Sequence, residues 1–254
     1  MKIENFSKNG YLIIKNGISK NLIKEIQSQI LNKIIKKKIT KNSYSKFSNF
    51  FKKTKNEKLF NLIKPLNDYL FSKEYINKTL HQKKLFDTIT YLLGRDLAVS
   101  ADSSLTINLT DNKKNYYYKE WHQEIWSGAS TSSVQIWLPL FHKSRTDGQI
   151  SLMKNSHKWG HVPNSNRKPL KLPKNYSTID SNLNLGDVIL FSTTLLHKTS
   201  AGKHPRLGLA MTIKNFKYKE TSFSDNHNWK IFSYSEMTKI QRILGNHYLS
   251  PFRV

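Results

Sequence analysis

The stretch Val134-Gln135-Ile136-Trp137-Leu138-Pro139-Leu140 decides the architecture, because every second residue from Val134 onward is aliphatic. A period of two is typical of a β-strand, in which successive side chains point to opposite faces. The same alternation recurs at residues 105–109, 150–152 and 207–213. Turn signals such as Thr146-Asp147-Gly148 separate these segments. Several short alternating strands of this kind predict a sandwich or barrel with a jelly-roll core.

The region before residue 95 carries a helical period instead. Ser19 is a suitable N-cap for a first helix, and a second apolar stripe runs from about residue 75 to Gly94, the residue type that commonly follows a helix end. A short β-prone run over residues 9–17 precedes the first helix. Residues 39–58 are polar and lack a clear period, so we expect a loop or basic insertion there. The first helical stripe consists of Leu22, Ile23, Ile26, Ile30 and Ile34.

These patterns predict one mainly β domain with flanking helices over residues 1–254. We expect a helical N-terminal part over about 1–95, packed outside a jelly-roll core over about 96–220. A C-terminal extension over about 221–254 follows. No internal repeat or low-complexity linker divides the chain.

Composition excludes several classes of protein. A hydrophobic content of 37% supports a buried core, while the longest apolar runs contain only a handful of residues, too few for a membrane-spanning helix. The first residues lack the apolar region of a secretory signal, so we expect a cytoplasmic protein. There is no cysteine, so histidines and carboxylates must hold any metal ion.

The formal charge is +25, from 42 Lys and Arg against 17 Asp and Glu. A charge of this size is typical of nucleic-acid binders. However, 36 of the 42 basic residues are lysines, whereas bidentate phosphate recognition favours arginine. Lys, Asn and Ile share A/T-rich codons, so a biased genome explains the charge more simply. A functional surface for polyanions stays open as the second interpretation.

The triplet His122-Gln123-Glu124 carries the candidate chemistry. Residues two apart on an extended segment point to the same side, so His122 and Glu124 can reach one cation together. A downstream strand beginning near Gly186 delivers His197. Two histidines and one carboxylate form the facial triad of non-haem Fe(II) oxygenases, which leaves metal positions open. The same set with an open position also suits zinc.

Four segments in this order resemble the phytanoyl-CoA dioxygenase family of Fe(II)- and 2-oxoglutarate-dependent oxygenases. Residues 9–19 look like its opening strand and helix entry, and residues 121–124 resemble its His-Gln-Asp motif. Residues 154–160 resemble its Gly-Ser-His-Lys segment, and residues 186–206 its closing Gly-Asp-Val, His and Pro-Arg elements. The resemblance covers most of the chain and implies a cupin-like double-stranded β-helix.

The resemblance also implies roles for individual residues. It makes His122, Glu124 and His197 the iron ligands and Arg206 the clasp for the distal carboxylate of 2-oxoglutarate, which a planar guanidinium suits. Further positions would flank this co-substrate or contact the substrate. The expected co-substrate residues are Thr199, Asn108 and Trp137, and the expected substrate contacts are Gln123 and Trp126.

Two features depart from the family pattern. Glu124 stands where the family mostly has Asp, which makes this ligand one methylene longer. A carboxylate here argues against the halogenating branch, in which a small residue leaves room for chloride. The interval from His197 to Arg206 is shorter than is common, which implies a trimmed turn at residues 200–204.

The resemblance implies an enzyme that uses Fe(II), 2-oxoglutarate and O2 to hydroxylate a C–H bond of a small molecule, with release of succinate and CO2. A specialised metabolite or a cell-envelope glycan precursor is the expected substrate, and the basic segment 164–175 could receive an anionic one. A zinc hydrolase is an alternative, although hydrolysis gives Arg206 no role. A polyanion-binding module without catalysis is another, although we do not expect nucleic acid to be a partner. The sequence does not indicate an oligomeric state.

Overall fold

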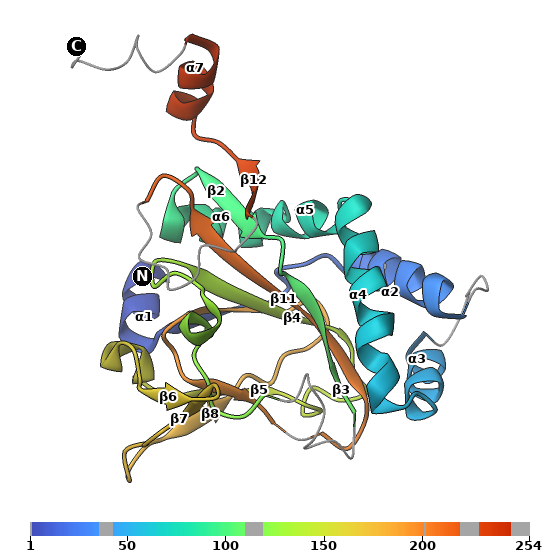
Figure 1. Cartoon of the computed structure of the whole chain (residues 1–254). Coiled ribbons are helices and arrows are strands. Elements are labelled where there is room, and N and C mark those ends of the chain that lie inside the picture. Colours follow the sequence, from blue (N-terminus) through green and yellow to red (C-terminus); the bar gives the residue numbers. More distant parts are fainter. Residues whose placement is uncertain (1, 36–42, 110–118, 201, 219–228, 245–254) are drawn as a thin grey trace.

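The computed structural model describes residues 2–35, 43–109, 119–200, 202–218 and 229–244. Two antiparallel sheets face each other in these residues (Figure 1). The large sheet has the order β1(Tyr11–Ile14), β9(Val188–Ser192), β4(Val134–Phe141), β11(Arg206–Asn215), β2(Leu97–Ser100) and β12(Trp229–Ser233), with β3(Ser104–Asn108) also paired to β11. The small sheet has the order β10(His197–Thr199), β5(Ile150–Met153) and β8(Thr178–Asp180), and a separate hairpin joins β6(Asn164–Ser165) to β7(Lys168–Pro169).

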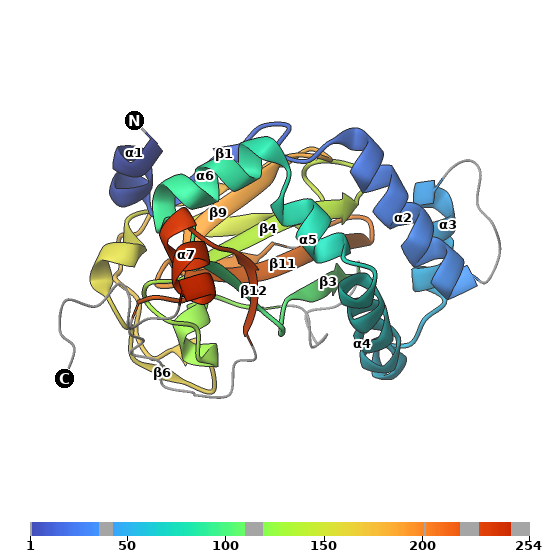
Figure 2. The same cartoon turned by 90° about the horizontal axis from the view of Figure 1, so that it is seen from above.

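Helices from the N-terminal part cover the face of the large sheet that points away from the small sheet, as Figure 2 shows for α2, α4, α5 and α6. The Ser19 hydroxyl accepts a hydrogen bond from the Leu22 amide at the start of α2, which confirms the predicted N-cap. The helices are α1(Lys2–Asn9), α2(Lys20–Ile35), α3(Ser43–Lys52), α4(Asn56–Ser72), α5(Tyr75–Leu80), α6(Lys83–Leu93) and α7(Glu236–Leu244), with 3-10 turns η1(Glu124–Ser127) and η2(Ser156–Trp159). The predicted mainly β fold with N-terminal helices outside the core is confirmed.

Each central strand of the large sheet divides its side chains between two environments. On β4, Ile136 and Leu138 belong to the main core under the helices, whereas Gln135 and Trp137 line a cavity on the opposite face. All eight residues of β4 are buried, because the helices cover one face and the small sheet covers the other. The aliphatic alternation therefore predicts the strands correctly, but it marks the face that packs against the helices rather than the interior between the sheets.

The segment that we expected to be a loop at 39–58 contains two helical parts, α3 and the start of α4, so this prediction was wrong. Phe47 and Phe51 lie four residues apart on α3 and are fully buried. The Phe47 ring stacks on Phe141 of β4 at 4.5 Å between centroids. These aromatic contacts stabilise a helix whose other residues are mostly polar. Residues 36–42 of the region lie outside the described residues.

Two other predicted boundaries differ from the structure. The helix expected over 75–93 is two helices, because the backbone at Gln82 is extended (φ −63°, ψ 123°) between α5 and α6. The sheet also takes strands from both flanks of the predicted core, since β1 pairs with β9 and β12 pairs with β2. No helix in the described ranges combines the length and the apolar character needed to cross a membrane.

Candidate metal centre and active-site cavity

His122 and His197 meet through the backbone as well as through their rings. They form an isolated antiparallel bridge, in which the His122 amide donates to the His197 carbonyl (2.9 Å) and the His197 amide donates to the His122 carbonyl (3.0 Å). This exchange of two bonds places the residues directly opposite each other. Their ring centroids are 4.1 Å apart. The bridge explains how two histidines far apart in sequence reach one point.

Glu124 completes the cluster because Gln123 is extended (φ −110°, ψ 144°), so the side chains on either side of it share a face, as predicted. The Glu124 Oε1 atom lies 3.2 Å from His197 Nε2 and 3.5 Å from His122 Nε2. The three residues offer ligand atoms that all lie within 4.8 Å of one another. Glu124 is the first residue of the 3-10 turn η1.

Backbone carbonyls orient both imidazoles. His122 Nδ1 lies 2.7 Å from the Glu120 carbonyl, and His197 Nδ1 lies 2.9 Å from the Leu195 carbonyl. A carbonyl only accepts hydrogen bonds, so each Nδ1 carries the proton and each Nε2 presents a lone pair toward Glu124. Three acceptor atoms then converge in a buried site, and this arrangement needs a cation between them.

The protonation states of the cluster also suit a cation. Burial, followed by the nearby His197, lowers the pKa of His122 to about 4, so this imidazole is neutral at physiological pH. Burial would raise the pKa of Glu124, but the positive charge of Lys119 is the largest of the effects that hold that pKa well below its usual range. Neutral imidazoles and an ionised carboxylate are the forms that bind a divalent metal.

Arg206 is the first residue of β11 and is almost fully buried. Its Nε and Nη1 atoms have no hydrogen-bond partner among the described residues. Burial lowers the pKa of its guanidinium to about 9. A buried, unpaired guanidinium fits a carboxylate that arrives with a ligand, such as the distal carboxylate of 2-oxoglutarate.

The short turn before Arg206 packs closely against the turn that ends at Gly148. A Cβ on Gly202 would come within 2.5 Å of the Gly148 amide nitrogen. The buried Asp147 carboxylate accepts hydrogen bonds from the Lys203 amide (3.2 Å) and from His204 Nδ1 (3.2 Å). The trimmed interval that departs from the family pattern is thus held by contacts between two turns.

The three positions expected to flank the co-substrate lie around Arg206 and the histidine bridge. The Arg206 guanidinium carbon is 4.5 Å from the centroid of the Trp137 ring, whose Nε1 donates to Thr106 Oγ1 at 3.1 Å. Asn108 pairs in register with Arg206 across β3 and β11, and its Nδ2 donates to the Ser200 carbonyl at 3.1 Å. Thr199 is buried on β10, two residues after His197, and lines the cavity.

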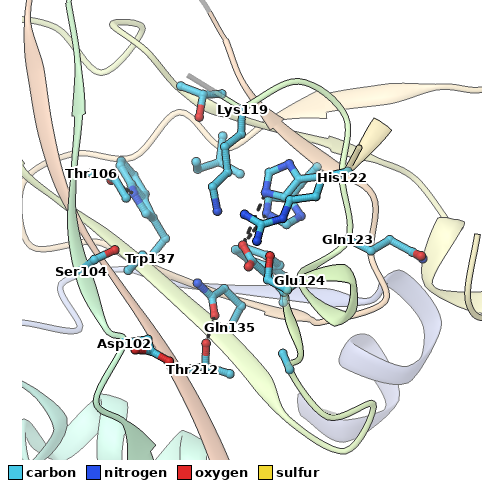
Figure 3. Close-up of a pocket in the computed structure, with 18 of the residues that line it drawn as sticks. Asp102, Ser104, Thr106, Lys119, His122, Gln123, Glu124, Gln135, Trp137 and Thr212 are labelled. Carbon is cyan, nitrogen blue, oxygen red and sulfur yellow. Dashed lines mark hydrogen bonds and ion pairs between the residues drawn. The ribbon is translucent and has the colours of Figure 1, made fainter. Parts of the chain in front are cut away.

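Gln123 and Trp126 are placed differently from the other candidates. The Gln123 side chain is buried and points away from the cavity (Figure 3), and its Nε2 donates to the Gly160 and Thr194 carbonyls while its Oε1 accepts from the Val162 amide. Trp126 Nε1 donates to the Val162 carbonyl at 3.0 Å, and its ring packs on a small apolar cluster. Both side chains clamp the segment around residue 160, so their expected contact with substrate stays a prediction without geometric support.

A cavity of about 640 Å³ lies in front of the metal cluster. Figure 3 shows His122 and Glu124 on one side of it and polar side chains of the large sheet on the other. We did not predict these polar residues, although those on β3, β4 and β11 occupy positions that alternate with the aliphatic stripe of their strand. The cavity residues missed by the sequence analysis include Asp102, Ser104, Thr106, Lys119, Gln135 and Thr212.

The two facing sheets, the His122, Glu124 and His197 cluster and the buried guanidinium define the class of non-haem iron oxygenases that use 2-oxoglutarate. The model of the phytanoyl-CoA dioxygenase (PhyH) family matches residues 6–208, and the chain belongs to this family. A search of curated proteins found no match to the chain. Iron and 2-oxoglutarate are accordingly the cofactor and co-substrate expected at this site.

Solved structures with low sequence identity share the fold. The non-heme monooxygenase ThoJ in its apo form superimposes with a TM-score of 0.60 at 15% identity, over 93% of this chain and 85% of that chain. The alpha ketoglutarate dependent epimerase SnoN from nogalamycin biosynthesis gives a TM-score of 0.54 at 12% identity, over 84% of this chain and 80% of that chain. A complex of SnoN with Fe3+, alpha ketoglutarate and nogalamycin RO gives 0.53 at 13% identity, over 84% and 82%. One neighbour is a monooxygenase and another an epimerase, so the fold does not specify the outcome of the reaction.

Proposed function

We propose that this protein is an Fe(II)- and 2-oxoglutarate-dependent dioxygenase that hydroxylates a C–H bond of a small molecule and releases succinate and CO2. The convergence of two imidazole lone pairs and one carboxylate in a buried site carries the proposal. A specialised metabolite or a cell-envelope glycan precursor is the substrate class that we infer. Cytoplasmic location remains part of the same proposal.

The residues of the site would have the following roles. His122, Glu124 and His197 would hold the metal, which supplies the oxidising chemistry when bound. Arg206 would pair with the distal carboxylate of 2-oxoglutarate and so satisfy its own buried charge. Phe191 lines the cavity, and its ring centroid is 4.5 Å from that of His197, so it excludes water beside this ligand.

Anaerobic titration with Fe(II) and 2-oxoglutarate tests the proposal. We expect a weak visible charge-transfer band in the wild type, and O2-dependent succinate release when air is admitted. Glu124→Ala and His197→Ala should each abolish the band and reduce succinate release at least a hundredfold, since each removes one of three metal ligands.

The exposed His81 on the helical side of the fold provides a matched control, and His81→Ala should leave both signals unchanged. Circular dichroism of each variant establishes that the fold survives. Unchanged succinate release in Glu124→Ala or His197→Ala would contradict the proposal. Zinc-dependent hydrolysis that needs neither O2 nor 2-oxoglutarate would support the hydrolase instead.

A further inference from the structure

The cavity is larger than a five-carbon diacid needs, and the wall remote from the metal cluster is polar. Gln135 and Thr212 lie side by side on neighbouring strands, and the Thr212 hydroxyl donates to Gln135 Oε1 at 2.6 Å. This bond uses only the Oε1 atom, so the two N–H groups on Nε2 of Gln135 have no partner among the described residues. Ser104 and Thr106 add hydroxyl groups to the same wall (Figure 3). A wall of this kind can hold the polar part of a substrate through hydrogen bonds.

A tight hairpin brings basic side chains to this cavity from a distant part of the sequence. Strands β6 and β7 pair through Ser165 and Lys168, so their loop consists only of Asn166 and Arg167. Both loop residues have positive φ, 50° and 59°, as a two-residue hairpin loop of type I′ requires. Glycine is the usual second residue of such a loop, and an arginine there costs about 1 kcal/mol. Strained residues of this kind cluster at functional sites and ligand clamps.

The tip of this hairpin carries unpaired positive charge. Asn166, Arg167 and Lys168 all line the cavity and are exposed. The side chains of Arg167 and Lys168 make no hydrogen bond or ion pair with any described residue. Their charges are therefore available to a ligand in the cavity.

Other charged groups line the same cavity and contribute to its net charge. Lys119 points into it toward Glu124 (Figure 3), and its charge helps to lower the pKa of that carboxyl. The carboxylates are Asp102, Glu120 and Glu124, of which Glu124 belongs to the metal cluster and Asp102 has an interaction of its own. The lining thus carries three cations and three carboxylates, and two of the cations, Arg167 and Lys168, lie together at the hairpin tip. This local pair of positive charges favours an anion at the tip.

We propose that the substrate bears a phosphate or carboxylate group, which Arg167 and Lys168 bind at the hairpin tip while the Gln135 wall receives the polar remainder of the molecule. This inference rests on the proposed function, because it names the substrate class of the same cavity. A guanidinium at the tip can form two parallel hydrogen bonds with such a group.

Calorimetric titration of the full-length, metal-free protein tests the inference with three probes of related shape: glucose 6-phosphate, glucuronate and neutral glucose. We expect at least one anionic probe to bind roughly tenfold more tightly than glucose, and the stronger of the two identifies the group as phosphate or carboxylate. The double variant Arg167→Gln, Lys168→Gln should lose this preference.

A control with the same change in net charge separates the hairpin from the general basic surface. Arg145 and Lys171 are exposed and do not line the cavity, so Arg145→Gln, Lys171→Gln should retain the preference. Equal loss in both double variants, or no preference for either anion in the wild type, would overturn the inference. The Fe(II) and 2-oxoglutarate band is measured separately on the wild type, and its absence would refute the proposed function without altering the outcome of the anion titration.

Discussion

Arg206 is the residue in which stability and function conflict most directly. Its guanidinium is buried with two nitrogen atoms unpaired, and burial lowers its pKa to about 9. A buried charge without a partner destabilises the folded protein. The contact with the Trp137 ring compensates only in part. The structure retains a side chain that helps the fold less than an apolar one of similar size.

Arg206→Met should therefore separate the two roles. Without 2-oxoglutarate, we expect the free energy of unfolding to stay the same or rise by about 1–4 kcal/mol, because a buried unpaired charge is removed. With Fe(II) under argon, 2-oxoglutarate should raise the Tm of the wild type but not that of the variant. Thermal melts with and without the diacid provide the measurement.

The exposed Arg145 supplies the comparison for this substitution, since Arg145→Met should leave the response to 2-oxoglutarate intact. An equal rise in Tm for Arg206→Met and the wild type would show that Arg206 does not bind the diacid.

Strands β4 and β11 position the cavity wall through one close contact. A Cβ built on Gly208 would lie 2.4 Å from the Trp137 ring, so the indole rests directly on the β11 backbone. The φ angle of Gly208 lies outside the left-handed region, so steric contact rather than backbone conformation requires glycine here. The same indole contacts Arg206 and donates to Thr106.

Gly208→Ala should displace the Trp137 ring from this position. We expect the free energy of unfolding to fall by about 1–3 kcal/mol, as is typical of overpacking, together with weaker binding of 2-oxoglutarate. Urea denaturation followed by tryptophan fluorescence measures the first effect, and titration with the diacid measures the second.

Gly160→Ala is a useful counterpart, because Gly160 has positive φ but a Cβ added there would meet nothing within 4 Å. Gly160→Ala should lower the free energy of unfolding through backbone strain and leave the binding of 2-oxoglutarate unchanged. Unperturbed fluorescence and affinity in Gly208→Ala would argue against the positioning role of Trp137.

One buried carboxylate joins the end of β1 to the residues just before β9 in the large sheet. Asp187, just before β9, accepts hydrogen bonds from the Asn16 amide (3.0 Å) and the Asn184 amide (3.0 Å) and pairs with Lys15 at 2.9 Å. Burial alone would raise the pKa of Asp187, but these partners hold it below 3.8. The carboxylate thus stabilises the fold when ionised.

Stability should follow the titration of this group. Because the folded-state pKa is lowered, its contribution is complete above the unfolded-state pKa, about 3.9, and is lost as the pH falls through the folded-state value. Asp187→Asn should lower the free energy of unfolding by about 1–3 kcal/mol at pH 7. The difference from the wild type should narrow below pH 3.8. Urea titrations across this range measure both effects.

Within the described residues Asp68 forms only an exposed pair with Lys64, so Asp68→Asn should change the free energy of unfolding by less than about 0.5 kcal/mol. A pH-independent difference for Asp187→Asn would contradict the assigned role of the carboxylate.

The charge of +25 remains a property of the whole surface. Three of the positive charges, on Lys119, Arg167 and Lys168, line the cavity. The interpretation of the remainder as genome bias, and the expectation that nucleic acid is not a partner, stay predictions.

Local patterns in the sequence were sufficient for strands β1, β3, β4, β5, β9 and β11, for the N-cap at Ser19 and for the order of the candidate metal ligands. They did not predict β2, β8 or β12. Periodicity reports burial, and His122 and Glu124 share a face because one extended residue separates them, so both features can be predicted from neighbouring residues. The bridge between His122 and His197, the contact of the Trp137 ring with Gly208 and the approach of the β6–β7 hairpin to the cavity depend on residues far apart in the chain. A period of two also cannot show which covered face of a strand meets helices and which meets a cavity, because that depends on the layers that pack on each side.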